Sequence, residues 1–185
     1  MPEKLIVETC SPVLAGLKTA NLFNCPYQSE KELLHDVADL NDRLSKKGIH
    51  AMVLSSPSAG RALIYLFRPD RLQVDLDDPQ VKEILRQKGY DTTCVGSCLT
   101  GLIHHLHDDT SFPHEIGCFL GYPVEDVRGF MENRPCIFYG IWKVYGNPEE
   151  KKKLFHTYDS CTKSYLRAYE KGMTLESLTA GKSSS

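Results

Sequence analysis

Apolar residues recur at helical spacing most clearly between Ser29 and Gly48. Ser29 and Glu32 have the spacing of a capping box, in which a serine side chain caps a helix start. The apolar residues that follow fall on one helical face, and they are Leu33, Leu34, Val37, Leu40 and Leu44. This pattern predicts a helix that starts after Ser29 and is stopped by Gly48.

Proline and glycine bound the other predicted helices. Ser11 followed by Pro12 has the pattern of an N-cap with proline in the first turn, which predicts a short helix through Leu17. Asp78 and Pro79 begin another helix, and Gly89 ends it. Further helices are predicted from Val95 to Asp108, as two short helices within residues 111–133 that meet at Tyr122-Pro123, and from Asn147 to Gly172.

Runs of β-branched and aromatic residues indicate strands. The segments IHAMVLSS and RALIYLF are separated by PSAG and predict a hairpin. An extended segment is expected near residues 19–23, and CIFYGIWKVYG, residues 136–146, predicts one strand. We therefore expect an α+β or α/β fold, a single domain over residues 1–172 with a small mixed sheet of three to five strands covered by helices. Residues 173–185 have few apolar side chains and are expected to form a mobile tail.

Charge and cysteine content narrow the class of protein. A net charge of -2 and a pI near 6.4 argue against a dedicated nucleic-acid binder, which would carry a strong basic patch. No apolar stretch approaches the roughly 18 residues of a membrane span, and the charged N-terminus does not resemble a signal peptide. A cytoplasmic protein is expected. Its 7 cysteines form no CxxC pair and are expected to be free thiols.

A histidine-rich segment precedes the two short helices. Imidazole and carboxylate groups suit transition metals, and they are concentrated at His104, His105, His107, Asp108, Asp109, His114 and Glu115. The helical register places His104, His105 and His107 mainly on the solvent side, which favours a solvated helix face over a metal site. We therefore predict no metal, and the sequence identifies no cofactor.

His114 and Glu115 follow Pro113 and are predicted to lie in the first turn of a helix. The helix dipole would there favour the Glu115 anion and a neutral His114, which could act as a base, donor or ligand, or merely cap the helix. Gly117 and Gly121 predict that something packs closely against this helix, either protein or a flat ligand. A metal pair of His114 with Cys118 has too few ligands to be convincing.

Cys10 precedes the helix predicted to start at Ser11, where backbone amides would stabilise a thiolate. It is therefore a candidate nucleophile, with His114 as base and Glu115 as the group that orients His114. Cys94 and Cys98 lie one helical turn apart, and packing in the core is preferred for both. Strand-associated Arg68 and Lys143 are candidates for binding an anion.

Several segments together resemble one protein family. They are TCSPVLAGLKTANLF, LIYLFRPDRL, FPHEIGCFLGYPVEDVRGF and YGIWKVYGNPEEKKKLFHTYDSCTKSY. The ensemble, over about residues 8–172, resembles the bacterial domain-of-unknown-function family numbered 3793. The resemblance implies a cytosolic protein of anaerobic bacteria, tilted toward iron or redox physiology, and carries no established activity. Positions matching the family pattern include Cys10, Lys18, Arg68, His114, Glu115, Tyr122, Trp142 and Lys143.

The leading hypothesis is a cytosolic small-ligand-binding or accessory protein of anaerobic iron or redox metabolism. Its expected partner is a small anionic ligand or a redox protein such as flavodoxin. Residues expected to bind the ligand are Lys18, Arg68, Tyr122, Trp142 and Lys143, with Cys10, His114 and Glu115 as candidate catalytic residues. Alternatives are a Cys-His hydrolase or transferase with Cys10 as nucleophile, and an interaction module without a pocket. The oligomeric state is left open.

Overall fold

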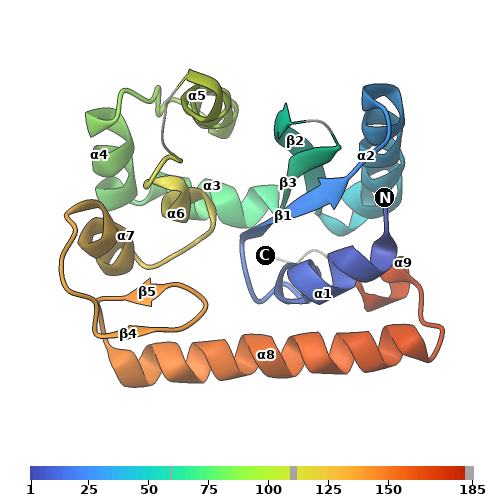
Figure 1. Ribbon diagram of the computed structural model, residues 1–185. Helices are drawn as coiled ribbons and strands as arrows, with labels where there is room; N and C mark the ends of the chain where they lie inside the picture. The colour runs from blue at the N-terminus through green and yellow to red at the C-terminus, as the bar shows by residue number, and fades with distance from the viewer. Residues whose placement is uncertain (59, 109–111, 182–185) are drawn as a thin grey trace. The chain divides into compact units, whose positions relative to one another are not determined.

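A computed structural model of the chain describes residues 1–58, 60–108 and 112–181 (Figure 1). The fold is α+β, as predicted. Its elements in chain order are α1 (Glu3–Leu14), β1 (Ala20–Pro26), α2 (Glu30–Leu44), η1 (Ser45–Lys47), β2 (His50–Ser58), β3 (Arg61–Phe67), α3 (Pro69–Asp77), α4 (Pro79–Gln87), α5 (Val95–Asp108), α6 (Ile116–Phe119), α7 (Val124–Met131), β4 (Phe138–Tyr139), β5 (Lys143–Val144), α8 (Pro148–Glu170) and α9 (Leu175–Leu178). Ala59 of the expected turn, Asp109 of the histidine-rich segment and residues 182–185 of the expected tail lie outside the described residues.

The chain divides into two compact units. Unit 1 comprises Met1–Arg71 with Cys161–Ser185, and unit 2 comprises Leu72–Ser160. In the described part of the chain, no helix combines the length and apolar character needed to span a bilayer.

Unit 1 is built on a three-stranded sheet with the order β1-β3-β2. Both strand pairs are antiparallel, and Ile64 of β3 lies opposite Phe23 on one side and Val53 on the other. The predicted β2–β3 hairpin is therefore confirmed. The expectation of a mixed sheet is wrong, because every pair of hydrogen-bonded neighbours in this sheet is antiparallel.

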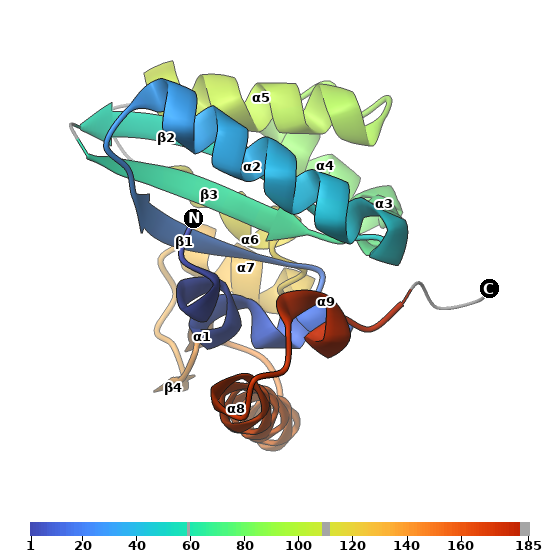
Figure 2. The ribbon, with the colours of Figure 1, turned by 90° about the vertical axis from the view of Figure 1, so that its right-hand side faces the viewer.

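Helices α1 and α2 cover one face of this sheet, and Figure 2 shows α2 running along it. Alternate residues of β3, Ala62, Ile64 and Leu66, share one apolar core with both helices, as expected when every second strand residue faces the same side. The predicted start of α2 is confirmed, because the Ser29 hydroxyl accepts a hydrogen bond from the Glu32 amide at 3.2 Å.

Helix α1 differs from its prediction. It begins at Glu3, and Pro12 lies inside its C-terminal part instead of in a first turn. The Ser11 hydroxyl donates to the carbonyl of Val7 one turn earlier, so it does not cap a helix start. The predicted start at Ser11 is wrong, and Cys10 is an interior residue of α1.

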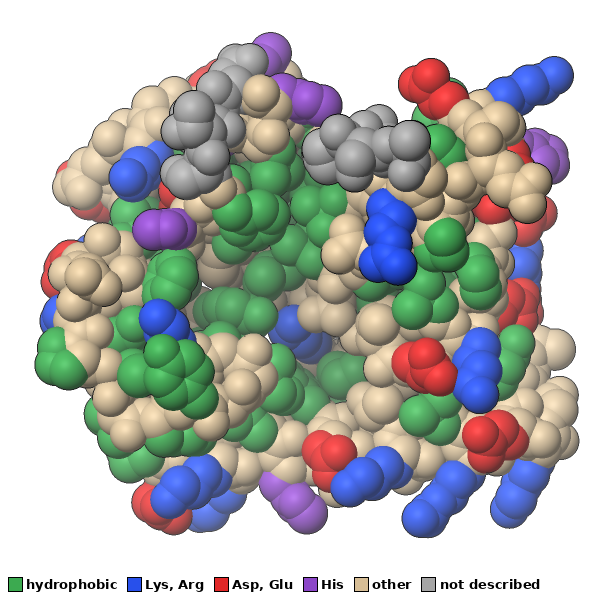
Figure 3. Space-filling view, in the orientation of Figure 1, with side chains coloured by type: hydrophobic (Ala, Val, Ile, Leu, Met, Phe, Trp, Pro, Cys, Tyr) green, Lys and Arg blue, Asp and Glu red, His purple; other side chains and the backbone are tan. Residues whose placement is uncertain are grey.

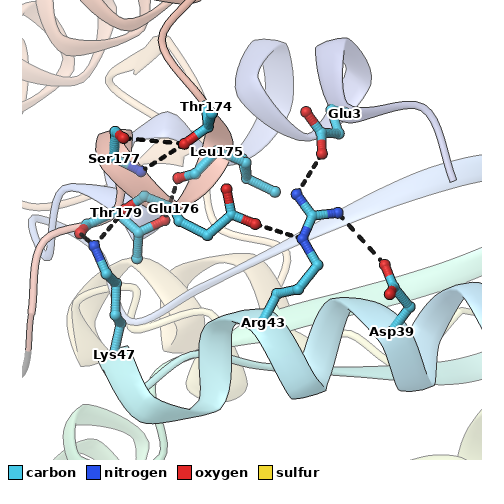
Figure 4. Close-up of polar contacts among 9 residues, drawn as sticks. All are labelled: Glu3, Asp39, Arg43, Lys47, Thr174, Leu175, Glu176, Ser177 and Thr179. Carbon is cyan, nitrogen blue, oxygen red and sulfur yellow. Dashed lines mark hydrogen bonds and ion pairs between the residues drawn. The ribbon is translucent and has the colours of Figure 1, made fainter.

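The segment after Met173 also differs from expectation. Leu175 and Leu178 of α9 are buried in the unit 1 core, and the Thr174 hydroxyl accepts from the amide of Ser177 at the helix start. Polar contacts join α9 to the rest of the unit (Figure 4). The guanidinium of Arg43 pairs with Glu176, Glu3 and Asp39, and the Lys47 ammonium donates to the carbonyls of Glu176 and Thr179. Residues 173–181 therefore form an ordered part of unit 1.

Unit 2 confirms the predicted helix boundaries at Asp78, Gly89 and Val95. The single strand predicted over residues 136–146 is wrong. That segment forms a short hairpin, in which Phe138 of β4 lies opposite Val144 of β5. Gly140 lies in the turn, where an added Cβ would come within 2.1 Å of the Phe155 ring.

Candidate functional site

The corner between α6 and α7 forms the base of the candidate site. Gly121 has a φ of +68°, a left-handed conformation that glycine adopts at low cost, and Pro123 precedes α7. Gly117 packs against protein, because an added Cβ would lie 2.8 Å from Val127 Cγ2 and 3.2 Å from Tyr122 Cδ2. The close approach predicted at Gly117 is therefore made by α7 and by the Tyr122 side chain.

Asp126 of α7 fixes the strand that lies over this corner. Its carboxylate, 2% exposed, accepts hydrogen bonds from Trp142 Nε1 at 2.8 Å and from the amides of Tyr145 at 2.7 Å and Gly146 at 3.0 Å. A buried carboxylate with three donors is a strong anchor, because each bond is assisted by its charge. Asp126 therefore holds the indole of Trp142 in one orientation.

A pocket of about 220 Å³ lies between the α6–α7 corner and β5. It is lined by His114, Ile116, Gly117, Tyr122, Asp126, Val127, Phe130, Trp142 and Lys143, and we call it the aromatic pocket. Tyr122 and Trp142 stack with ring centroids 4.2 Å apart, and His114 meets the Phe130 ring edge-on at 4.8 Å. Burial raises the pKa of Tyr122 to about 12, so its phenol is neutral. The pocket thus has walls formed largely by flat rings.

Lys143 provides a cation beside these rings. Its ammonium lies 5.1 Å from the centroid of Phe130 and 5.4 Å from that of Tyr139, within the range of cation–π interactions. A hydrogen bond with the Tyr139 side chain raises the pKa of Lys143, which therefore stays charged. Four residues singled out from the sequence, His114, Tyr122, Trp142 and Lys143, thus line one pocket.

Glu115 does not lie in this lining. Its carboxylate is 3% exposed, accepts a hydrogen bond from the Tyr90 hydroxyl at 2.9 Å and lies 3.3 Å from Nδ1 of His105. The expectation that His105 simply faces solvent is therefore wrong. The dipole argument for His114 and Glu115 is also wrong, because both precede α6, which has only 4 residues.

Cys10 has surroundings that disfavour a nucleophile. Its side chain is 0% exposed, and burial raises the pKa of the thiol to about 11 despite a contact of 3.4 Å with the Thr9 hydroxyl. The expectation of a depressed pKa at Cys10 is wrong, because the thiol is buried and does not lie at a helix start. Cys10 belongs to unit 1, whereas His114 and Glu115 belong to unit 2.

Lys18 and Arg68 also belong to unit 1. The Lys18 ammonium donates to Asn21 Oδ1 at 2.7 Å, and burial lowers the pKa of Lys18 to about 8. The buried guanidinium of Arg68 donates to backbone carbonyls, at 2.7 Å to Val13 and 2.8 Å to Leu14, with further bonds to Lys47 and Ala180. Arg68 therefore joins the C-terminal end of α1 to the end of the described chain, which is a structural role.

Cys94 has the properties that the sequence assigned to Cys10. It is exposed, immediately precedes α5, accepts a hydrogen bond from the amide of Ser97 at 3.4 Å and shares another with the Ser97 hydroxyl at 3.4 Å. These bonds, the hydroxyl first, lower the pKa of the Cys94 thiol. Core packing is therefore wrong for Cys94 and confirmed for buried Cys98. The signal was present in the sequence, since Cys94 directly precedes the predicted helix start at Val95.

The other cysteines do not form a metal site in the part of the chain that the structure describes. All the cysteines are free thiols, as predicted, and burial followed by the charge of Glu115 raises the pKa of Cys118 to about 12. Over the described ranges, no group of 3 or more His, Cys, Asp or Glu side chains is placed to hold a metal ion.

Comparison with known proteins places the chain in a family. No curated protein and no solved structure matches it. A family model described as "Protein of unknown function (DUF3793)" matches residues 6–179, which is nearly the whole chain and agrees with the resemblance carried by its motifs. The chain belongs to the DUF3793 family.

Proposed function

We propose that this protein binds a small, flat, mainly apolar ligand in the aromatic pocket of unit 2. The observation that carries the proposal is the lining of that pocket, in which Tyr122, Phe130 and Trp142 surround about 220 Å³. Ligand sites are typically concave and apolar, with a few polar groups that set orientation. His114 and Lys143 supply such groups here.

The size of the pocket limits the ligand. A volume of about 220 Å³ lies below the ~300–1,000 Å³ typical of sites for drug-sized molecules, so the ligand has one or two fused rings. Stacking on a fixed ring adds about 0.5–1.5 kcal/mol beyond the burial of apolar area. Because Asp126 already orients Trp142, little ordering of the indole opposes binding.

Binding fits the described groups better than nucleophilic catalysis. Cys10, the candidate nucleophile, is buried with a raised pKa, and the lining of the aromatic pocket contains no cysteine or serine. An accessory role in anaerobic iron or redox metabolism is the part of this proposal that rests on the family resemblance alone, whereas the cytoplasmic location also follows from the expectation drawn from the sequence. The identity of the bound ligand would decide that role.

The single tryptophan of the chain makes the proposal testable. Trp142 lies in the pocket wall, so titration with the neutral dye N-phenyl-1-naphthylamine should quench its fluorescence and excite the dye by energy transfer. Phe130→Leu keeps an apolar side chain but removes a ring, and should weaken binding by a few-fold up to about tenfold.

Ile137→Ala is the matched control for that titration, because Ile137 is exposed and does not line the pocket. It should leave the affinity unchanged, with the far-ultraviolet circular dichroism of both variants checked against wild type. Absence of saturable quenching in the wild type would overturn the proposal, as would an equal loss in the two variants.

A second candidate function is protein docking through the β4–β5 hairpin. Ile137, Tyr139 and Ile141 are 56%, 71% and 51% exposed, and Figure 3 shows hydrophobic side chains gathered over this hairpin. Exposed apolar patches commonly mark interaction sites. The partner that the family resemblance suggests is a redox protein such as flavodoxin. Titration calorimetry with flavodoxin should show binding that Ile141→Ser weakens, and no heat of binding in the wild type would exclude this partner.

A further inference from the structure

A second pocket adjoins the aromatic pocket in unit 2. Its volume is about 380 Å³, and His114 lines both pockets. The other residues of its lining come from α4, α7 and the residues that follow each helix: Glu83, Ile84, Gln87, Lys88, Arg128, Met131 and Glu132. We call it the polar pocket. His114 thus borders both pockets, which places them next to each other.

The acidic and basic side chains of the polar pocket differ in whether they have partners within the protein. Glu132 pairs with Nε of Arg134 at 2.7 Å, and Glu83 accepts a hydrogen bond from the side chain of Gln87 at 2.7 Å. In the ranges that the structure describes, the side chains of Lys88 and Arg128 have no ion pair or hydrogen bond. The carboxylates thus have protein partners, while the side chains of Lys88 and Arg128 line the pocket without one in the described ranges.

We propose that the ligand carries an acidic group that binds Lys88 and Arg128 in the polar pocket while its ring occupies the aromatic pocket. The inference rests on the proposed function and names the ligand class, an aromatic or heteroaromatic ring joined to a carboxylate, sulfonate or phosphate. A guanidinium and an ammonium match such groups, since charge-assisted hydrogen bonds are the strong ones.

The same arrangement restricts the charge of the ligand. Glu83 and Glu132 line the pocket beside the two cations and would repel additional negative charge. A compact group of low charge is therefore favoured over a polyphosphate. His114, whose ring packs edge-on against Phe130, lies where the ring and the acidic group of the ligand are joined.

A pair of dyes that share one ring system separates the two pockets. 8-Anilino-1-naphthalenesulfonate carries a sulfonate that N-phenyl-1-naphthylamine lacks, and energy transfer from Trp142 reports the binding of either to the folded protein. In the wild type, the sulfonate dye should bind about tenfold more tightly, an effect that added salt should reduce. Arg128→Gln and Lys88→Gln should each remove most of this preference and leave the affinity for the neutral dye unchanged.

Arg134→Gln is the control, because Arg134 pairs with Glu132 but lines neither pocket. It should retain the preference for the sulfonate dye. If the wild type binds the neutral dye and binds the sulfonate dye no more tightly, this inference is overturned while the proposed function stands. An Arg128→Gln variant that loses affinity for both dyes equally would also overturn it. Failure of both dyes to bind would instead overturn the proposed function itself.

Discussion

At the scale of single residues, burial and immediate donors decide the chemistry of identical side chains. Cys10 and Cys94 are both thiols that the sequence associates with helices. The pKa of Cys10 is raised by burial, whereas the pKa of exposed Cys94 is lowered by Ser97. Residue type and spacing could predict that a helix N-terminus activates a thiol, but the choice of cysteine depended on where α1 begins.

Cys94 should be the cysteine most readily alkylated in the folded protein. Its lowered pKa means that the thiolate fraction at pH 7–8 exceeds that of an ordinary thiol, and it is exposed. Cys10 and Cys118 should react only on unfolding, because both are buried and their pKa values are raised to about 11 and about 12. Peptide mapping by mass spectrometry after brief treatment with iodoacetamide, over a series of pH values, measures each rate.

Ser97→Ala is the control for that experiment, because it removes the hydroxyl that contributes most to the lowered pKa of Cys94. The midpoint of the rate against pH should then move to higher pH, while the rates at Cys10 and Cys118 stay low. A Cys94 midpoint that is the same in folded and denatured wild-type protein would contradict the prediction.

The candidate site was predictable in part at this scale. His114, Tyr122, Trp142 and Lys143 were singled out from the sequence and line one pocket. Arg68 was singled out for the same chemistry but binds backbone carbonyls in unit 1. Sequence indicates that an arginine can bind an anion, but only packing determines whether its donors are already occupied.

At the scale of elements, three local capping signals predicted helix starts correctly, whereas the one at Ser11 did not. The side chains of Ser29, Asp78 and Asn147 each accept a hydrogen bond from an amide in the first turn of the helix that follows. The prediction of one strand over residues 136–146 was wrong, because strand propensity does not distinguish a single strand from a hairpin. Gly140 was the available signal, since glycine within a strand pattern often marks a bend or a close approach.

Two glycines of α5 should respond oppositely to alanine. An added Cβ at Gly101 would lie 2.8 Å from Cδ1 of Tyr90, the buried ring that donates to Glu115. Gly101→Ala should therefore lower the free energy of unfolding by about 1–3 kcal/mol through overpacking. Gly96 is exposed, and an added Cβ there would have its nearest neighbour, Cys94 Sγ, at 3.7 Å. Gly96→Ala should therefore raise the free energy of unfolding by up to about 1 kcal/mol. Urea unfolding followed by Trp142 fluorescence measures both, and equal effects of the two changes would contradict this account of α5.

At the scale of the whole molecule, the path of the chain links the two units. The predicted α+β class is confirmed, because periodicity separates helices from strands without reference to their packing. The division into units was not visible in the sequence, since neither boundary falls in a linker. Arg71 and Leu72 both lie in α3, and Ser160 and Cys161 both lie in α8. Whether the chain behaves as the predicted single domain therefore depends on whether the two units unfold cooperatively.

We expect the two units to unfold together, because α8, a helix of 23 residues, begins in unit 2 and ends in unit 1. Trp142 fluorescence reports on unit 2 and far-ultraviolet circular dichroism on both, so their urea midpoints should coincide in the wild type. Ser160→Pro should separate them, since proline inside a helix costs about 3 kcal/mol or more. Ser160→Ala, at the same exposed position, should keep them coincident. Separate midpoints in the wild type would show instead that the chain folds as two independent domains.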